Sequence, residues 1–446
     1  SSISPQIAEL DSSTVSFSGS GSDSDGTISE YKWISSIDGD LSTSASFSKT
    51  DLSFGNHTIT FRVKDNDDVW SDNVTSWVDV RKSPEWSYDA ENLVISVAIS
   101  ANGEYIVISG DEKVHLFDKN SSTPLWSYTT ENSVYSVAIS ADGEYIVASS
   151  CDNKVYLFDK SNNTPLWSYS IDSGCSSSVA ISANGEYITV SDDDKVSFFD
   201  KDSSTPLWSY TAGSSVVTVA ISADGEYITA GSHDDKVYLF NKGSSNPIWS
   251  YEATGDVSQV SISADGEYIV VGSHNSEAIL FNKNNSTPLW TYSLHDTVYV
   301  DISADGKYIV AGSYSHNSVD TKIYLFEKAS STPLWSYDTQ DSVRSVAISA
   351  DGKYVVVGSD EENLTLIDGN SGNRLWNYAT GDTVRSVAIS ADGEYITAGS
   401  FSEERAYTFR NDPVSRPSVI PYSPRSGTDT LLNTNLSWFP GSDDIT

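Results

Sequence analysis

Two arginines are the residues of this sequence best suited to bind a charged ligand. Arg344 and Arg385 stand in two identical segments, Val-Arg-Ser-Val-Ala-Ile-Ser, 41 residues apart. Two guanidinium groups can hold a carboxylate or a phosphate through charge-assisted hydrogen bonds. The alternative, which the acidity of the chain favours, is that they pair with Asp341, Asp382 or neighbouring acidic loops. At the equivalent position other copies of this segment carry uncharged residues: Ile95, Tyr135, Val217, Ser258 and Val298.

Histidines indicate a second possible chemistry, because imidazole nitrogens with nearby carboxylates bind transition metals. Four of the six histidines lie in loops that the repeat described below brings to one face: His233, His274, His295 and His316. Corresponding loops of adjacent repeats should lie about 10 Å or more apart, the usual spacing of packed sheets. We therefore expect solvated histidines rather than a shared metal site.

Aspartates near the N-terminus indicate a possible calcium site. Asp23, Asp25 and Asp65, with Asp67 and Asp68 close by, could supply oxygen ligands. Asp-Xaa-Asp-Gly alone is a weak signal, and ordinary turn aspartates explain it as well. No other cofactor is expected. The sequence has no HExxH, no Gly-Xaa-Ser-Xaa-Gly and no phosphate-binding loop, so we do not expect an enzyme.

These candidates are positioned by a repeat of about 41 residues. Tryptophan marks its end at eight places: Trp86, Trp126, Trp167, Trp208, Trp249, Trp290, Trp335 and Trp376. A Ser-Ala-Asp/Asn-Gly turn also occurs eight times. Each unit contains four short runs rich in β-branched and aromatic residues, separated by turn residues such as Asp142-Gly143. The repeat therefore predicts four-stranded antiparallel blades.

The order of the runs predicts how the ring of blades closes. A lone fourth strand at residues 85–88 precedes the first complete unit, and the last unit has only three strands. We expect residues 85–88 to pair with the strand around residues 405–409, which leaves no exposed edge at the junction. The prediction is an all-β fold with an eight-bladed β-propeller over residues 83–411.

One repeat reads Phe158-Asp159-Lys160, then Pro165-Leu166-Trp167-Ser168-Tyr169. It resembles the repeat of PQQ-like (quinoprotein-like) eight-bladed propellers, and residues 230–237 also resemble a WD-type repeat. This resemblance implies the fold and leaves the function open. Quinoprotein enzymes are expected to carry adjacent cysteines over the cofactor. Here Cys151 and Cys175 are not adjacent, so we do not expect quinone binding.

The two cysteines are the only ones in the chain. Cys151 lies in the loop between the second and third strands of the second unit, and Cys175 lies in the connection to the third unit. Strand direction brings both segments to the same face at the same junction, so we expect a disulfide. Two free thiols are the alternative. This face also carries the variable loops, which makes it the expected binding face.

The ends of the chain indicate further domains. The run Gly-Ser-Gly-Ser-Asp-Ser-Asp-Gly-Thr-Ile, with Val63-Lys64-Asp65-Asn66, resembles a PKD domain, an Ig-like β-sandwich, over residues 1–82. Trp33 would be its core tryptophan. Four closely spaced prolines, Pro413, Pro417, Pro421 and Pro424, predict an extended linker, and the end of the chain resembles the start of a fibronectin-type or second Ig-like domain. We assign both to residues 412–446.

Composition limits the partners. With 62 acidic and 26 basic residues the net charge is −36, which argues against nucleic acid and anionic membranes. No run of 18 apolar residues exists, so we expect no direct membrane insertion by this fragment. The chain contains no methionine, which indicates a piece of a longer protein. Candidate glycosylation sites in Asn-Xaa-Ser/Thr triplets are Asn56, Asn73, Asn120, Asn162, Asn284 and Asn363.

Archaeal and bacterial surface-layer proteins resemble this combination of a PKD-like domain and a propeller. We therefore expect an extracellular, cell-surface protein with a non-catalytic structural or adhesion role. The propeller would be the interaction platform for other cell-surface proteins, glycans or copies of the chain. The alternative is a ligand-binding or enzymatic propeller with an anion site formed by Arg344 and Arg385 at the mouth of the central channel.

Overall fold

The computed structural model describes residues 2–4, 6–10, 13–172, 175, 177–315 and 321–411. Regular structure in these residues is entirely β-strand, and none of them belongs to a helix that could cross a membrane. The described residues up to Ser83 form one compact unit, and Pro84–Asn411 form the other. The predicted linker and partial domain at 412–446 lie outside the described residues.

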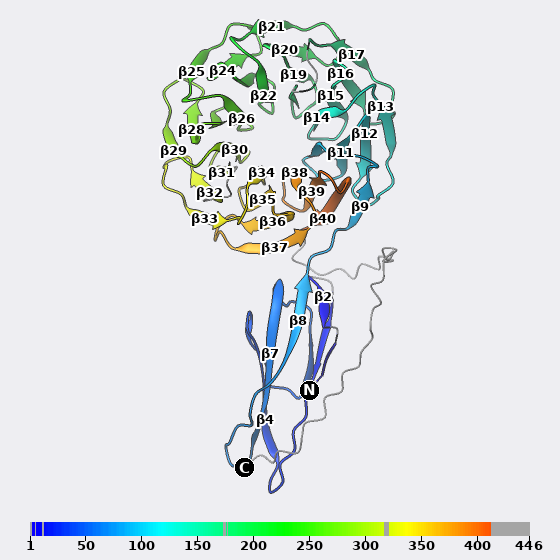
Figure 1. Cartoon of the computed structure of the whole chain (residues 1–446), viewed down its shortest axis with the longest axis vertical. Helices are drawn as coiled ribbons and strands as arrows, with labels where there is room; N and C mark the ends of the chain where they lie inside the picture. Colours follow the sequence, from blue (N-terminus) through cyan, green and yellow to red (C-terminus); the bar gives the residue numbers. More distant parts are fainter. Residues whose placement is uncertain are drawn as a thin grey trace. The chain divides into compact units, whose positions relative to one another are not determined.

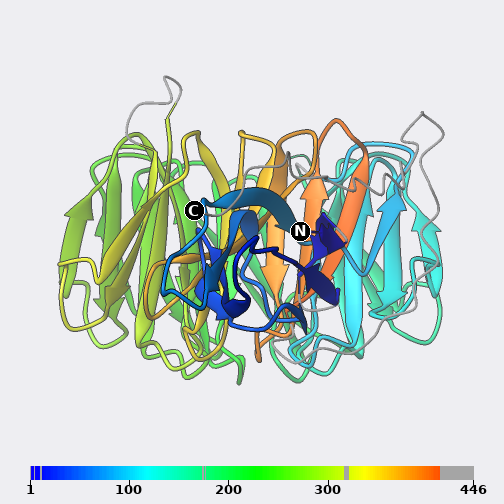
Figure 2. The same ribbon diagram turned by 90° about the horizontal axis from the view of Figure 1, so that it is seen from below.

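The second unit is a propeller of eight four-stranded antiparallel sheets. Figure 1 shows the blades arranged radially, with the first strand of each blade nearest the centre and the fourth at the rim. Figure 2 shows the same strands from the side, with loops at both of their ends. The predicted all-β propeller is therefore confirmed.

Strands in the first four blades have nearly the same length and order. They are β10 (Ser96–Ile99), β11 (Tyr105–Gly110), β12 (Lys113–Asp118) and β13 (Trp126–Thr129); β14 (Val134–Ile139), β15 (Tyr145–Ser150), β16 (Lys154–Asp159) and β17 (Trp167–Ser170); β18 (Val179–Ile181), β19 (Tyr187–Asp192), β20 (Lys195–Asp200) and β21 (Trp208–Thr211); β22 (Val216–Ile221), β23 (Tyr227–Ser232), β24 (Lys236–Asn241) and β25 (Trp249–Glu252).

Blades five to eight repeat the pattern. They are β26 (Val257–Ile262), β27 (Tyr268–Ser273), β28 (Glu277–Asn282) and β29 (Trp290–Ser293); β30 (Thr297–Ile302), β31 (Tyr308–Tyr314), β32 (Lys322–Glu327) and β33 (Trp335–Asp338); β34 (Val343–Ile348), β35 (Tyr354–Ser359), β36 (Asn363–Asp368) and β37 (Arg374–Ala379); β38 (Val384–Ile389), β39 (Tyr395–Ser400), β40 (Arg405–Arg410) and β9 (Trp86–Asp89).

The eighth blade joins the two ends of the propeller sequence. Strand β9 pairs antiparallel with β40, with Trp86 opposite Thr408 and Asp89 opposite Arg405. The predicted pairing is confirmed, although the strand begins one residue later than residue 85. Glu85 still takes part, because its backbone N–H donates to the Thr408 carbonyl at 2.8 Å.

Neighbouring blades are tied together at the Ser-Ala-Asp/Asn-Gly turns, whose side of the propeller we call the turn face. Each turn alanine donates its N–H to the carbonyl of the equivalent alanine in the next blade, at 2.9–3.1 Å. The eight residues close a ring: Ala101, Ala141, Ala183, Ala223, Ala264, Ala304, Ala350 and Ala391. The turn glycine beside them needs its positive φ, for example 76° at Gly143, where a Cβ would lie 2.4 Å from Tyr105.

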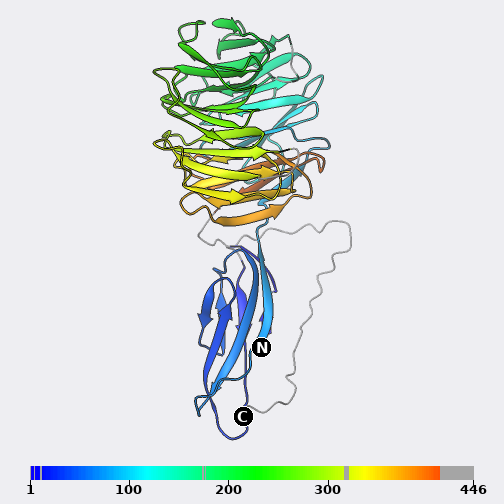
Figure 3. The ribbon, with the colours of Figure 1, turned by 60° about the vertical axis from the view of Figure 1, so that its left-hand side comes forward.

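The first unit is a two-layered β-sandwich. One sheet has the order β1 (Ser2–Ser4), β3 (Val15–Ser18), β6 (Ser46–Lys49); the other has the order β2 (Ile7–Glu9), β8 (Val74–Arg81), β7 (Gly55–Asp65), β4 (Ile28–Ser35), β5 (Gly39–Ser42). Figure 3 shows its long strands. Both sheets contribute to one core around Trp33, which is fully buried as expected and packs against Phe17 and Phe61.

Ring closure through β9 can be tested by truncation. Removing residues 1–88 deletes the Trp86 side chain, which is 9% exposed and donates through Nε1 to the Lys119 carbonyl at 2.7 Å. Burial of a tryptophan contributes at most about 4–6 kcal/mol, and β40 would become an open edge. We expect the 1–88 deletion to melt well below the 1–82 deletion in thermal unfolding followed by circular dichroism. Equal melting temperatures would contradict the closing role of β9.

Candidate functional site

Variation between the blades is concentrated on the face opposite the turn face. We call it the loop face; it consists of the loops after β11, β15, β19, β23, β27, β31, β35 and β39, with the connections between blades. A cavity of about 410 Å³ lies at its centre, lined by residues of seven blades. We call this cavity the channel mouth. Its lining residues are Ile95, Ser96, Tyr135, Ser136, Ser178, Val217, Tyr299, Arg344, Thr383, Arg385, Ser386 and Phe401.

β-Bulges in the innermost strands bring four of these side chains to the cavity. In five blades the pairing of the first strand with the second shifts by one residue. A bulge leaves its extra residue unpaired and changes the direction of the side chain. The extra residues are Tyr135, Val217, Ser258, Arg344 and Arg385, and all but Ser258 line the channel mouth.

Blade six differs from these five blades because its first strand has no bulge. Pairing is regular from Thr297 to Ile302. Val298 is consequently fully buried, and the next residue, Tyr299, lines the channel mouth instead. The prediction that Val298 occupies the channel entrance, made from its place in the repeat, was therefore wrong.

Tyr299 contributes a phenol to the channel mouth. Burial raises its pKa, with a further increase from Tyr314 and Tyr135, while Arg344 and Arg385 act in the opposite direction. The net pKa lies above the usual value of a tyrosine, so the hydroxyl stays protonated at neutral pH. Tyr299 can therefore donate a hydrogen bond to an anion.

Arg344 is already neutralised by the protein. Its Nε lies 2.7 Å from Asp360 Oδ1, and its guanidinium stacks 4.2 Å from the centre of the Tyr314 ring. The expected alternative, pairing with a neighbouring acidic loop, thus holds for this residue, with Asp360 as the partner.

Arg385 has no such partner. Its guanidinium stacks on Phe401 at 4.8 Å from the ring centre, and among the described residues no carboxylate forms an ion pair with it. Asp382, a partner considered from the sequence, accepts hydrogen bonds from the backbone N–H groups of Ser402 and Glu403 instead. Burial raises the pKa of Asp382, but these backbone donors and Thr383 outweigh it and leave the pKa below its usual value. Arg385 therefore offers an uncompensated positive charge to the channel mouth.

Sequence comparison agrees with this architecture. Residues 110–313 and 254–406 match the model of the PQQ-type repeat family described as outer membrane protein assembly factor BamB. The chain belongs to this family. No curated protein matches the chain. The family match covers the blades from the end of β11 to β40 and leaves the sandwich unmatched, so the resemblance of residues 1–82 to a PKD domain stays a prediction.

Of the four loop-face histidines, His233, His274 and His295 are exposed as expected, but the predicted separation is wrong for one pair. The rings of His233 and His274, on blades four and five, have their centres only 6.2 Å apart, less than the predicted separation of about 10 Å. The inward convergence of the blades brings their inner loops closer than the sheets themselves. His295 lies on an exposed connection, and His316 is outside the described residues.

The proposed calcium ligands act locally in turns. Asp65 Oδ1 accepts the backbone N–H groups of Asp67 and Val69, each at 2.9 Å. Asp23 Oδ1 accepts the N–H of Asp25 at 3.3 Å. In the part of the chain that the structure describes, no three acidic, histidine or cysteine side chains are grouped to hold a metal. Binding of calcium by Asp23, Asp25 and Asp65 stays a prediction.

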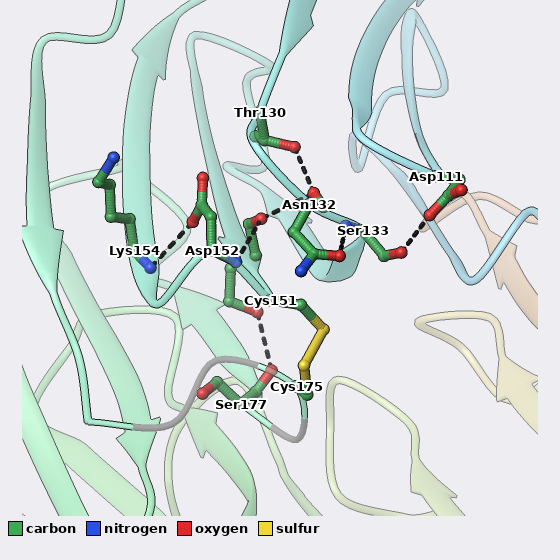
Figure 4. Close-up of a disulfide and its surroundings, with 11 residues drawn as sticks. Asp111, Thr130, Asn132, Ser133, Cys151, Asp152, Lys154, Cys175 and Ser177 are labelled. Carbon is green, nitrogen blue, oxygen red and sulfur yellow. Dashed lines mark hydrogen bonds between the residues drawn. A yellow bond between two sulfur atoms is a disulfide. The ribbon is translucent and has the colours of Figure 1, made fainter.

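Cys151 and Cys175 form a disulfide on the loop face, with their Cα atoms 4.4 Å apart. Figure 4 shows the bond between the β15–β16 loop and the connection that leads into blade three. Cys151 is also held by its backbone N–H, which donates to the Ser133 carbonyl at 2.8 Å. The bond therefore fixes the junction between blades two and three at the place that strand direction predicts.

Glycan acceptors differ in access. Five of the six predicted asparagines are exposed: Asn56, Asn73, Asn120, Asn162 and Asn284. Asn363 is half-buried, and its side-chain amide donates to the Glu361 carbonyl at 3.1 Å. Asn363 is thus the least accessible of the six candidates.

The disulfide should contribute measurably to stability. It closes a segment with a sequence separation of 24 residues, for which the chain-entropy model gives about 3–4 kcal/mol. We expect the double variant Cys151→Ser/Cys175→Ser to unfold at a lower denaturant concentration than the native chain. A reducing agent should shift the native chain to the same midpoint and leave the double variant unchanged. A native midpoint that is insensitive to reduction would contradict this expectation.

Proposed function

We propose that this chain is a non-catalytic binding platform of the cell exterior, which uses the loop face to hold a partner. The observation that supports this most strongly is the contrast between the two faces. The turn face repeats the same backbone hydrogen bond around the ring, whereas the channel mouth, the disulfide and the histidine pair all lie on the loop face. Functional residues of a rigid scaffold usually lie on such variable loops.

The channel mouth is suited to an anionic group of the partner, such as a carboxylate or a phosphate. Arg385 supplies the charge, and stacking on Phe401 holds the guanidinium plane in place. The chain as a whole is strongly acidic, with a net charge of −36, so a cation without a carboxylate partner at this place indicates selection for a ligand rather than for general charge balance.

Hydroxyl groups around the channel mouth add hydrogen-bond donors. Ser96, Ser136, Ser178 and Ser386 each accept, through Oγ, the N–H of a valine in the next blade at 3.1–3.3 Å. Because the oxygen of each hydroxyl already accepts, its proton is available to donate to another acceptor. An anion at Arg385 would then meet hydroxyl donors from several blades, with Tyr299 among them.

An extracellular setting is supported by independent features. The disulfide persists in oxidising compartments, and five predicted glycan acceptors are exposed. The PKD-like sequence of residues 1–82 is typical of cell-surface proteins, including surface layers. The family description, outer membrane protein assembly factor, is in keeping with a role at a cell envelope. Partners of this platform would be other surface proteins, glycans or copies of the chain.

An enzymatic propeller is the alternative function. The arginines would then bind the anionic part of a substrate. The described lining of the channel mouth contains no carboxylate, histidine or cysteine that could act as acid, base or nucleophile. This composition favours binding over catalysis.

Anion binding at Arg385 predicts a ligand-dependent stabilisation. With sulfate or citrate at constant ionic strength, the melting temperature of the native chain should rise, because a ligand that binds only the folded state stabilises it. Arg385→Ala should abolish this rise, whereas Arg405→Ala, in the same blade but outside the channel mouth, should retain it. An equal rise in both variants, or no rise in the native chain, would contradict the anion site.

A further inference from the structure

His233 and His274 hold the same position in adjacent blades. Each directly follows the second strand of its blade, β23 or β27. Each is fixed by its backbone N–H, which donates at 2.8 Å to the carbonyl of the connection into its own blade, Ser215 or Asp256. Both side chains are exposed on the loop face. The two imidazoles therefore project from rigid, equivalent anchors.

The distance between the rings is that expected for two ligands of one metal ion. A metal bound about 2.0–2.1 Å from each imidazole nitrogen keeps the two nitrogens within about 4 Å of each other. The ring centres of such a pair are then separated by about 5–6.5 Å. The observed separation is 6.2 Å, with an angle of 64° between the ring planes.

Hydrogen bonding leaves the nitrogens that a metal needs available. His274 Nδ1 lies 2.8 Å from Thr297 Oγ1, the first residue of β30. A hydroxyl partner on one nitrogen orients the ring and leaves Nε2 for a ligand, the usual arrangement of a metal-binding histidine. The His233 ring has no hydrogen-bond partner within the described residues.

Charge also favours a cation at this place. Asp256 occupies the position that Ser133 and Ser215 hold in their blades. The hydroxyls of these two serines donate to Asp111 and Asp193, which lie in the loop of the preceding blade. In blade four the corresponding loop residue is His233. Asp256 thus has a carboxylate at the sequence position where Ser133 and Ser215 have a hydroxyl. The net charge of −36 also raises the local concentration of cations around the chain.

We propose that His233 and His274 bind one late first-row transition-metal ion, Zn²⁺, Ni²⁺ or Cu²⁺, as a link between blades four and five. Imidazole is a preferred ligand of these ions. Because the described residues contain no third acidic, histidine or cysteine side chain grouped with the pair, water completes the coordination shell. This inference is independent of the anion site, since neither histidine lines the channel mouth.

Metal titration of the full chain tests the link. In isothermal titration with Zn²⁺, the native chain should bind one equivalent, and His233→Ala and His274→Ala should each weaken binding at least about tenfold. With Cu²⁺, electron paramagnetic resonance should show nitrogen hyperfine coupling that both variants lose. Thr297→Val should weaken binding less, because it changes only the orientation of the His274 ring.

His295→Ala is the matched control, because it removes another exposed loop-face histidine and should leave Zn²⁺ binding unchanged. The histidine variants should keep the native melting temperature without metal, since the His233, His274 and His295 side chains are exposed. Equal Zn²⁺ affinity in the native chain and the His233→Ala/His274→Ala double variant would show binding by carboxylates alone and overturn the proposal. Absence of binding at millimolar Zn²⁺ would also overturn the proposal, because the two imidazoles would then form only an edge-to-face ring contact.

Discussion

No blade of this propeller completes its hydrogen bonding by itself. At the turn face each alanine N–H is paired with the next blade, and at the rim seven tryptophans donate Nε1 to a carbonyl of the next blade at 2.7–3.1 Å. Near the channel a side-chain oxygen accepts the N–H of a valine one blade further on. These oxygens belong to Ser96, Ser136, Ser178, Thr218, Gln259, Ser345 and Ser386. A buried group left without its partner is costly, so the blades are stable only as a closed ring.

Blade six shows how strong this constraint is. In blade six, Tyr299 stands where the other blades have the side-chain oxygen that accepts a valine N–H of the next blade. This link between blades six and seven is therefore lost. Asp301 replaces an alanine and takes over: it accepts from Ser261 Oγ at 2.8 Å and from the Ile348 N–H at 3.1 Å, which connects blades five, six and seven. Burial raises the pKa of Asp301, while these hydrogen bonds lower it, and burial dominates. The substitution that brings the Tyr299 phenol to the channel mouth is thus compensated by Asp301, two residues further along the same strand.

The repeat alone was sufficient to predict the blades, the closure by residues 85–88 and the meeting of the two cysteines, because each follows from strand order and strand direction. The contents of the channel mouth were predicted only in part. Arg344 and Arg385 could be found as departures from the repeat. Tyr299 and Phe401 could not, because a missing bulge and a contact between a loop and an inner strand leave no periodic signal. The histidine separation was overestimated because the spacing of sheets was applied to loops near the axis, where the blades converge.

Two equivalent arginines of this repeat have different roles: Arg344 is paired within the protein, whereas Arg385 is available to a ligand. Each lies in a copy of the same heptapeptide, at the bulge of the first strand of its own blade, so their local structures are equivalent. Their surroundings differ at the residue after the second strand, which is Asp360 in blade seven and Phe401 in blade eight. Asp360 neutralises Arg344, whereas Phe401 can only stack on Arg385. Neither Asp360 nor Phe401 takes part in the links between blades that the turn alanines, the rim tryptophans and the side-chain oxygens near the channel form. The change from acid to aromatic therefore leaves those links intact. The positive charge at the channel mouth therefore depends on a residue that the fold leaves free to vary.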